Sequence, residues 1–519
     1  MIDIFSTNKS KIFFFFLFLY VFTSQGSIQS SDGMSMFKVT ESIVERGSLA
    51  VKSEREDIFK TSSDGKKYSK YGIGMSVFAV PFYLIGFLLS KVISENPFFV
   101  KQFVSSFFNP VVTAISTTLI YSIGEKLGYL KRSCLLLSIL FGTCSLSWVY
   151  IQDFFSQPLI VLFELAAINF IFSEGISHAK GAFFAGVIMG FALLTRLDTL
   201  VVVPVFVLYI LFRKSRNMQW GLGVRKSLPC FLSFIIPVVL AGIVALEYNQ
   251  IRFGLPFSTG GYAGELGTTV QGFFISLFTL LFSLGKGFFI YNPIFFLSFI
   301  GWKYLYKKHK VESLFFIALT IIYISLYSTH YRIYGGSHWG SRHLLVIVPY
   351  FILSIGNLLD IGWRKKWVVL LVLLSLFLQI SALMVNINRY HYQILLQLQK
   401  KSNGAVNYSM VVNYSIYHNP IVGQWKNIVQ VYSNFFQEEW IQEMVQKTKN
   451  GESFLGKDLE YVLKYGLALN VPNFWWCFLY VYGFPKWLVG SVVLIFLLAI
   501  FISGTALYRS FRWSNQFVA

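Results

Sequence analysis

The sequence predicts an all-α polytopic membrane protein with about 12 transmembrane helices and its N-terminus in the cytoplasm. Of its 519 residues, 55% are hydrophobic and only 13% are charged, whereas an ordinary soluble domain carries roughly 25% charged residues. Aromatic residues make up 18% of the chain, which suits lipid-facing helices with rings at the level of the headgroups. A water-soluble fold could not bury this much apolar surface, so the composition excludes a soluble protein.

The distribution of positive charge gives the orientation. The net charge is +20, but the basic residues form short clusters between apolar runs instead of one basic face, so we expect no nucleic-acid partner. Loops rich in Lys and Arg stay in the cytoplasm, which places these clusters on one side. They are Lys9/Lys11, Lys126/Lys131/Arg132, Arg213/Lys214/Arg216 with Arg225/Lys226, Lys303/Lys307/Lys308/Lys310, Arg364/Lys365/Lys366 and Arg509/Arg512.

Apolar runs of suitable length then define the spans. The first run, 12–28, is interpreted as an uncleaved span; a cleaved signal peptide is the alternative, because basic residues precede it and small residues follow it. The four cysteines lie in or beside apolar runs, so they are interpreted as packing residues and not as a disulfide framework. The other predicted spans are 100–124, 133–151, 158–172, 181–195, 197–212, 228–246, 287–305, 313–328, 344–359, 367–385 and 488–508.

The segments between these spans divide the chain into three parts. Residues 1–385 form the transmembrane module, with a first external loop at 29–99; residues 386–486 form a small external region of unknown fold; and residues 487–519 form the last transmembrane helix and a cytoplasmic tail. Within the first loop, 72–89 is predicted to be an interfacial helix, because counting it as a span would put Lys126 and Arg132 outside. The stretch 36–46 resembles an amphipathic helix with Glu41 and Glu45 on its wet face. Shorter external segments are predicted at 152–157, 196, 247–286 and 329–343.

Polar residues on the predicted outer side are candidates for a site, because polar groups near hydrocarbon are costly unless they function. Each also has an ordinary explanation. Asp32 could be a solvated loop acid, and the Gly- and Lys-rich turn around Lys70 could be lysines that snorkel at the interface. Arg196 and Asp198 could form a structural pair, although two residues apart on a helix they would not face each other. Further candidates are Asp153, at a turn between two spans, and the loop 331–343, in which Trp339 could stack on a sugar and Arg342 could hold a phosphate.

Taken in order, these segments resemble the glycosyltransferase C superfamily, the membrane enzymes that use polyprenyl-phosphate sugars and include the protein O-mannosyltransferases and the lipid A aminoarabinose transferases. Two departures stand out: Asp32-Gly33 replaces the acidic pair common in the family's first loop, and Gly72-Ile73 replaces its Pro-Pro. The C-terminal external region matches nothing in the family. The segments that carry the resemblance are Asp32; Tyr68-Ser69-Lys70-Tyr71-Gly72-Ile73-Gly74 through Pro81-Phe82-Tyr83; Leu194-Thr195-Arg196-Leu197-Asp198; Tyr248-Asn249-Gln250-Ile251-Arg252-Phe253-Gly254-Leu255-Pro256; Gly285-Lys286-Gly287-Phe288 with Tyr291-Asn292-Pro293; and Gly336-Ser337-His338-Trp339-Gly340-Ser341-Arg342.

The resemblance implies an inverting glycosyltransferase that moves a sugar from a polyprenyl-phosphate donor to an acceptor hydroxyl on a glycan, lipid or protein. It implies a multi-pass protein of the bacterial inner membrane with its active site on the external side. Asp32 would be the general base, and the donor phosphate would be held by cations, since phosphate is a good leaving group and needs no acid. The residues assigned to phosphate binding are Lys70, Arg196 and Arg342, and those assigned to support or substrate binding are Asp153, Asp198, Tyr68, His338 and Trp339.

Two other functions and one cofactor remain open from the sequence. A transporter or flippase for lipid-linked glycans would show an internal repeat and charged or broken helices in matching halves, and no such symmetry is visible. A ligase that moves a whole glycan from a lipid carrier would need the same external base and cations, so the sequence does not separate it. No cofactor is predicted; a divalent metal is not excluded, although no cluster of ligands has a recognisable spacing.

Overall fold

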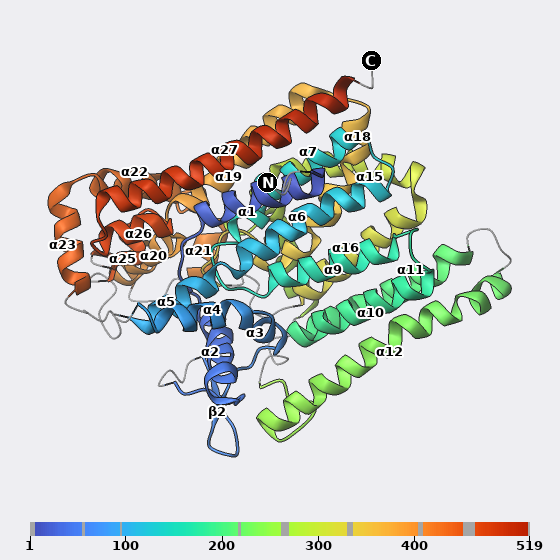
Figure 1. Cartoon of the computed structure of the whole chain (residues 1–519), viewed down its shortest axis with the longest axis horizontal. Coiled ribbons are helices and arrows are strands. Elements are labelled where there is room, and N and C mark those ends of the chain that lie inside the picture. The colour runs from blue at the N-terminus through green and yellow to red at the C-terminus, as the bar shows by residue number, and fades with distance from the viewer. Residues whose placement is uncertain are drawn as a thin grey trace.

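The computed structural model describes residues 6–53, 58–93, 96–215, 220–260, 269–329, 336–402, 408–449, 462–464 and 466–516. Helices dominate this part of the chain, and its two short strands, β1 (Lys60–Thr61) and β2 (Lys67–Tyr68), pair antiparallel. The longer helices run side by side, and α2 and the hairpin project from the bundle (Figure 1). The predicted all-α architecture is therefore confirmed.

The bundle is built from long helices and from shorter helices placed end to end. In chain order its elements are α1 (Asn8–Thr23), α6 (Phe108–Lys126), α7 (Lys131–Thr143), α8 (Leu146–Val149), α9 (Gln157–Ile171), α10 (His178–Thr195), η1 (Leu197–Val202), α11 (Val203–Ser215), α12 (Trp220–Phe253), α14 (Phe288–Tyr291), η3 (Pro293–Phe295), α15 (Phe296–Lys308), α16 (Lys310–Ser328), η4 (Arg342–Ile347), α17 (Val348–Ser354), α18 (Gly356–Asp360), α19 (Lys365–Met384) and α27 (Lys486–Gln516). The remaining helices are α2 (Ser31–Arg46), α3 (Gly74–Phe78), α4 (Val80–Ser90), α5 (Pro97–Ser106), α13 (Val270–Phe282), α20 (Ile387–Ser402), α21 (Tyr408–Tyr414), α22 (Pro420–Phe435), α23 (Glu438–Lys449), α25 (Leu467–Asn470) and α26 (Trp475–Val481).

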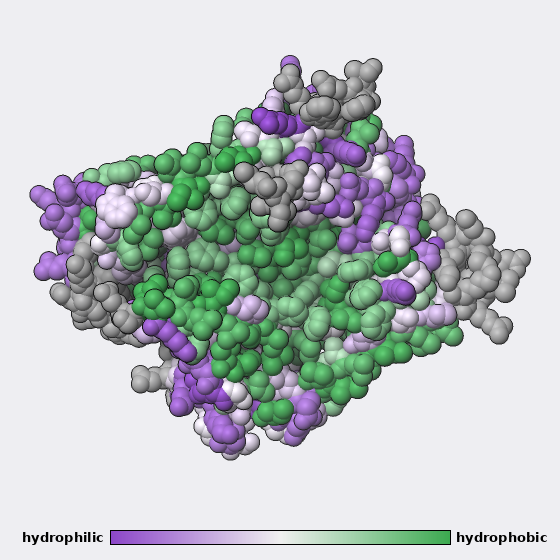
Figure 2. Space-filling view, viewed as in Figure 1, coloured by the Kyte–Doolittle hydropathy of each residue, from purple (hydrophilic) through white to green (hydrophobic). Residues whose placement is uncertain are grey.

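The surface and the helix lengths identify a multi-pass membrane protein. Hydrophobic side chains cover the middle of the face shown in Figure 2, and hydrophilic ones gather toward its edges. Within the described residues, seven helical stretches are long and apolar enough to cross a membrane: Pro97–Lys126, His178–Thr195, Ser227–Phe253, Lys310–Ser328, Arg342–Asp360, Lys365–Met384 and Lys486–Phe511. Shorter apolar helices cover Val80–Ser90, Gln157–Ile171 and Val270–Phe282. The total of about 12 spans stays a prediction.

Helix boundaries agree with the sequence where the apolar run is uninterrupted. The predicted spans 181–195, 313–328 and 367–385 coincide with α10, α16 and α19. The predicted span 287–305 is instead broken at Asn292 and Pro293, because proline has no N–H to continue the helix. The carbonyl of Tyr291 accepts a hydrogen bond from Gln379 Nε2 at 2.6 Å instead. The predicted external segment 247–286 contains α13, a largely apolar helix whose 13 residues are fewer than a full span needs.

The basic clusters meet at one end of the bundle, which we call the basic end. Lys9 pairs with Glu125 at 3.1 Å, and Lys11 Nζ lies 2.9 Å from Ser510 Oγ. Lys308 Nζ donates to the Gly128 carbonyl, and Asp360 accepts from the Leu130 N–H. Helix termini from widely separated parts of the chain are thus held together there. This agrees with the prediction that the basic loops share one side.

At the opposite end, which we call the site end, the region 386–486 docks on the end of α1. Trp475 donates its backbone N–H to the Ser24 carbonyl at 3.0 Å and its indole N–H to the Val21 carbonyl at 2.8 Å. The Trp476 indole donates to the Phe22 carbonyl at 3.1 Å. These bonds satisfy carbonyls that the helix end leaves open. They fix residues 466–482 against the start of the first loop.

The expected helix at 36–46 is present within α2, and Glu45 is exposed as predicted, but Glu41 is not. Glu41 is only 7% exposed and pairs with Lys38 at 2.7 Å. Glu45 pairs with Lys101 at 2.8 Å and accepts from the hydroxyl of Tyr83 at 2.6 Å. The hydrophobic periodicity identified the helix correctly, but it could not show that Lys101 of α5 lies 3.7 Å from Glu41.

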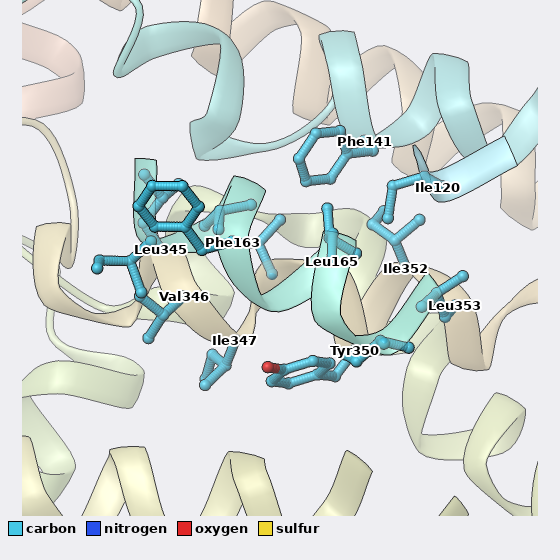
Figure 3. Close-up of a cluster of buried hydrophobic side chains, with 14 of the residues drawn as sticks. Ile120, Phe141, Phe163, Leu165, Leu345, Val346, Ile347, Tyr350, Ile352 and Leu353 are labelled. Carbon is cyan, nitrogen blue, oxygen red and sulfur yellow. The ribbon is translucent and has the colours of Figure 1, made fainter. Parts of the chain in front are cut away.

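A buried hydrophobic cluster connects the helices beneath the site end. Figure 3 shows Phe141 of α7 and Leu165 of α9 facing Ile352 of α17. The residues of η4 belong to the same cluster, with Leu344 and Ile347 fully buried. The start of η4 is therefore anchored by packing of the kind that fixes side-chain positions in protein cores. The four cysteines are all buried and free, as expected of packing residues.

Candidate functional site

Asp32 lies in the first turn of α2. Ser30 caps this helix, with its hydroxyl accepting from the Gly33 N–H at 3.0 Å. The carboxylate thus sits at the positive end of the helix dipole, where a negative charge is stabilised. The sequence placed Asp32 in a loop; the structure instead gives it a fixed position at a helix start.

An ion pair joins Asp32 to Arg342, 310 positions later in the chain. Arg342 Nη1 donates to Asp32 Oδ2 at 2.9 Å, and the hydroxyl of Tyr71 donates to Asp32 Oδ1 at 2.6 Å. Burial by itself would raise the pKa of Asp32, but the charge of Arg342, the Tyr71 hydrogen bond and the charge of His338 outweigh it and lower this pKa to about 2. Asp32 is therefore an ionised carboxylate held from two sides.

Arg342 begins η4 and is 8% exposed. Its guanidinium lies 4.6 Å above the ring of Phe155, a cation–π contact. His338 Nε2 lies 3.4 Å from Arg342 Nη1. The buried Nε of Arg342 has no hydrogen-bond partner in the protein. One strong donor of this side chain is therefore buried without a hydrogen-bond acceptor.

Lys286 supplies a second buried cation that the sequence did not identify. It lies in the connection between α13 and α14, is 2% exposed, and donates its ammonium to the carbonyls of Gly336, at 2.9 Å, and His338. Burial, and after it the positive charge of Arg342, lower the pKa of Lys286 to about 7. Its motif, Gly285-Lys286-Gly287, was noted for the resemblance without a role. A single lysine amid an apolar stretch is itself a signal of function in a membrane protein.

Asp153 supports the Asp32–Arg342 pair through a hydrogen bond to the start of α2. Its Oδ2 accepts from the Ser30 N–H at 2.8 Å, and its Oδ1 accepts from the Phe154 N–H at 2.7 Å. Burial raises the pKa of Asp153 to about 6 against these two hydrogen bonds. Because Ser30 caps α2, this carboxylate positions the helix that carries Asp32.

A second group of cations lines a neighbouring cavity. Lys70 and Arg196 share it with Arg252, which the sequence did not assign to the site. Arg252 Nη1 donates to the carbonyls of Ser69, at 2.5 Å, and Tyr71, at 3.0 Å, and so holds the turn that presents Tyr71 to Asp32. Tyr71 also lines this cavity, so it connects the two groups of charges.

Two glycines allow this turn to pack against the end of α10. A Cβ at Gly72 would meet the Leu194 carbonyl oxygen at 2.4 Å, and one at Gly74 would meet Thr195 Oγ1 at 2.1 Å. Any side chain there would force the backbones apart. The Gly72-Ile73 departure from the family's Pro-Pro therefore has a packing reason in this chain.

Arg196 and Asp198 face each other, contrary to the sequence analysis. Arg196 is extended, with φ −149° and ψ 122°, so the helical spacing argument fails. Its Nε and Nη2 lie 3.0 and 2.5 Å from Asp198 Oδ2, and the hydroxyl of Tyr327 donates to the same oxygen at 2.9 Å. Arg196 thus enters the cavity as a member of a side-chain network.

The remaining predicted site residues, Tyr68 and Trp339, make no contact with Asp32 in the part of the chain that the structure describes. Tyr68 donates to Asp64 at 2.9 Å within the hairpin and away from Asp32. Trp339 is 2% exposed and packs edge-to-face on Tyr291, which leaves little of its ring for stacking on a sugar. Of the loop 331–343, residues 331–335 lie outside the described residues. The structure therefore unites Asp32 with Arg342 and His338, places Lys70 with Arg196, and uses Asp153 as support.

No group of three or more His, Cys, Asp or Glu side chains that could hold a metal ion occurs among the described residues. The charged partner of Asp32 is Arg342. That the protein needs no cofactor stays a prediction from the sequence, which does not exclude a divalent metal.

No protein-family model and no curated protein matches the chain. The chain is similar to the solved structure of ArnT from Cupriavidus metallidurans in the apo state, with 12% identity over 95% of this chain and 74% of that one and a TM-score of 0.46. It is also similar to the structure of the same protein bound to undecaprenyl phosphate, with 11% identity over 83% of this chain and 78% of that one and a TM-score of 0.46. It is also similar to the oligosaccharyltransferase AglB from Archaeoglobus fulgidus, solved with an inhibitory peptide and a dolichol-phosphate, with 10% identity over 88% of this chain and 59% of that one and a TM-score of 0.42. These neighbours are glycosyltransferase C proteins, the superfamily that the sequence motifs resemble.

Proposed function

We propose that this protein transfers a sugar from a polyprenyl-phosphate donor to an acceptor hydroxyl, with inversion at the anomeric carbon, on the external face of the membrane. The observation that carries the proposal is the Asp32–Arg342 ion pair, together with a second buried cation, Lys286, whose charge interacts with that of Arg342. Lys286 donates to two carbonyls, so two positive charges lie close together in the site. A phosphate would relieve the repulsion between them, and cations aimed at a leaving phosphate stabilise the transition state.

The reaction divides between the base and the cations. Asp32 takes the proton of the acceptor hydroxyl as its oxygen bonds to the anomeric carbon. The bond between that carbon and the phosphate oxygen breaks, and polyprenyl phosphate leaves with the electron pair. Arg342 and Lys286 hold the departing phosphate, while Lys70 and Arg196 line the adjoining cavity. A single displacement without a second nucleophile inverts the anomeric centre.

The low pKa of Asp32 links donor binding to catalysis. A carboxylate whose pKa is about 2 is a poor proton acceptor. A phosphate that binds Arg342 shares the guanidinium charge with Asp32, and the pKa of Asp32 then rises because an anion has come near it. The base thus becomes effective only once the donor is in place. This arrangement would protect the resting site from wasteful proton transfer.

The direct test is a reaction of the purified chain with a panel of synthetic polyprenyl-phosphate monosaccharides. We expect release of polyprenyl phosphate and a sugar product of opposite anomeric configuration, measured by mass spectrometry and NMR, and a polyprenyl phosphate copurifying with the protein. Consumption of lipid-linked oligosaccharides alone would favour the glycan ligase, and movement of the intact lipid across vesicles without cleavage would favour the flippase. A retained anomeric configuration would contradict the single displacement.

The pKa of Lys286 predicts how donor affinity depends on pH. Free Lys286 has a pKa of about 7, and a bound phosphodiester, whose own charge is constant above pH 3, raises it. Binding therefore takes up a proton above pH 7, and the donor Kd should be constant below about pH 7 and rise by up to about tenfold per pH unit above it. Titrations of a labelled donor between pH 6 and 9 measure this. In Lys286→Gln the Kd should be weak and independent of pH; a pH dependence that persists in this variant would exclude Lys286 as its cause.

A further inference from the structure

A cavity of about 440 Å³ lies between the first external loop and the C-terminal external region. Its walls come from residues 25–29, from α5, and from segments 388–392 and 466–482. Figure 1 shows α5 beside α25 and α26, at the site end of the bundle. The mechanism proposed above does not use this cavity.

Carboxamide and aromatic side chains line the cavity, together with aliphatic ones such as Ile28, Leu467 and Leu469. Four carry carboxamides, Gln25, Gln29, Gln102 and Asn388, and six are aromatic, Phe99, Phe103, Tyr392, Trp475, Phe478 and Tyr482. None of the described lining residues is charged. Carboxamides both donate and accept hydrogen bonds, as hydroxyl groups do, and aromatic rings cover apolar faces. This combination suits a ligand that is neutral, rich in hydroxyl groups and faced with C–H bonds.

The cavity wall is held rigidly. Gly26 has φ +68°, and a Cβ there would meet Trp475 Cβ at 2.5 Å, so the chain of the first loop lies directly on Trp475. Trp475 is bonded to the end of α1 through both its backbone and its indole N–H. Phe103 packs edge-to-face on Trp475 with ring centres 5.7 Å apart. A preformed wall of this kind lowers the entropic cost of binding.

The cavity leads to the catalytic centre. Gln25, Gln29 and Asn388 also line a smaller cavity that contains Asp153 and His338. His338 in turn lies against Arg342, the partner of Asp32. A ligand in the larger cavity could therefore extend one end toward the base.

The uncharged cavity differs in chemistry from the cavity that contains Tyr71, the hydrogen-bond donor to Asp32. The one lined by Lys70, Arg196 and Arg252 offers cations, as a phosphate requires, whereas the uncharged one offers amides and rings. Three of the carboxamides already bind within the loop, Gln25 and Gln29 to Ser27 and Gln102 to the Ile28 carbonyl. A hydrocarbon tail would offer no partner for their remaining N–H groups and oxygens, at a cost in free energy. Building on the proposed function, we propose that the uncharged cavity binds the acceptor and that the acceptor is a neutral saccharide chain.

The test labels one cysteine placed in the cavity. All four native cysteines are buried, so Gln102→Cys in the full chain in membrane vesicles should be the reactive position for an impermeant maleimide. A neutral trisaccharide, from a panel of chitotriose, mannotriose and maltotriose, should slow labelling about elevenfold at ten times its Kd. Trigalacturonate and undecaprenyl phosphate should not slow it. The matched control is Gln442→Cys, on exposed α23 of the same external region, whose labelling no probe should change.

Each other outcome contradicts the proposal in a different way. Protection by undecaprenyl phosphate would make the cavity a lipid site, equal protection by trigalacturonate would show that neutrality is not selected, and protection by none of the neutral sugars would remove the acceptor site. Saccharide protection should persist in Asp32→Asn, because Asp32 does not line this cavity.

Hydrolysis of a polyprenyl-phosphate sugar by the unmodified chain, without saccharide, reports on the proposed function alone. Hydrolysis without protection would reject the acceptor site, and protection without hydrolysis would reject the transferase.

Discussion

Replacing Asp32 by Asn is expected to lower the turnover number by roughly 10²–10⁴-fold, the usual scale for general base catalysis, while donor binding stays nearly intact. The amide keeps the size of the carboxylate and can still accept the hydrogen bond that Tyr71 now donates at 2.6 Å. It cannot take the proton of an acceptor hydroxyl. Steady-state kinetics together with donor titration measure the two effects separately. Glu439→Gln, an exposed acid of α23, is the control and should retain full activity.

The pH profile of kcat/KM tells Asp32 from the next candidate base, since this ratio reports the groups of the free enzyme. If Asp32 is the base, its pKa of about 2 predicts no loss of kcat/KM as the pH falls from 6 to 4. If Asp153 is the base, its pKa of about 6 predicts a loss below pH 6. Full activity of Asp32→Asn would likewise shift the role to Asp153. Loss of donor binding in Asp32→Asn as severe as in Arg342→Ala would make the acid a structural partner of the arginine.

Arg342→Ala is expected to weaken donor binding by about 2–5 kcal/mol, or roughly 30- to 5000-fold in Kd, because a buried phosphate charge loses its partner. The variant also leaves Asp32 without the ion pair at 2.9 Å, so the pKa of Asp32 should rise. Donor titration measures the first effect. Lys307→Ala removes one positive charge at the basic end, where the side chain is exposed, and should leave the Kd unchanged. Equal weakening in both variants would indicate a general effect of net charge and remove Arg342 from the phosphate site.

Several helices could be predicted because a helix that crosses a bilayer must be long and apolar, and both properties are visible in the sequence. The helices α10, α16 and α19 coincide with uninterrupted apolar runs, which leave no alternative. The break at Asn292 and Pro293 was missed, since the hydrophobicity of a window is not changed by one proline. Short α13 was missed for a related reason: length was the criterion, and a short helix at a membrane protein's external side need not meet it.

Much less of the candidate site could be predicted, because its geometry depends on contacts between distant segments. Asp32 and Arg342 were each identified from local chemistry, but no local pattern shows that they form a pair. The pairing of Arg196 with Asp198 depends on an extended residue at the end of α10, which the helical pattern did not reveal. Lys286 was given no role because it ends the predicted external segment 247–286, where a lysine is ordinary.

The docking of Trp475 and Trp476 on α1 imposes an order on biosynthesis. Their indole groups bind carbonyls that lie 454 positions earlier in the chain. At a synthesis rate of about 5–20 residues per second, roughly 20–90 s pass before these partners exist. Until then the end of the first helix is open, and the uncharged cavity has only the walls contributed by the N-terminal part. The nascent protein can therefore present its Asp32 helix early, but it cannot enclose a saccharide until residues 475–482 have been synthesised.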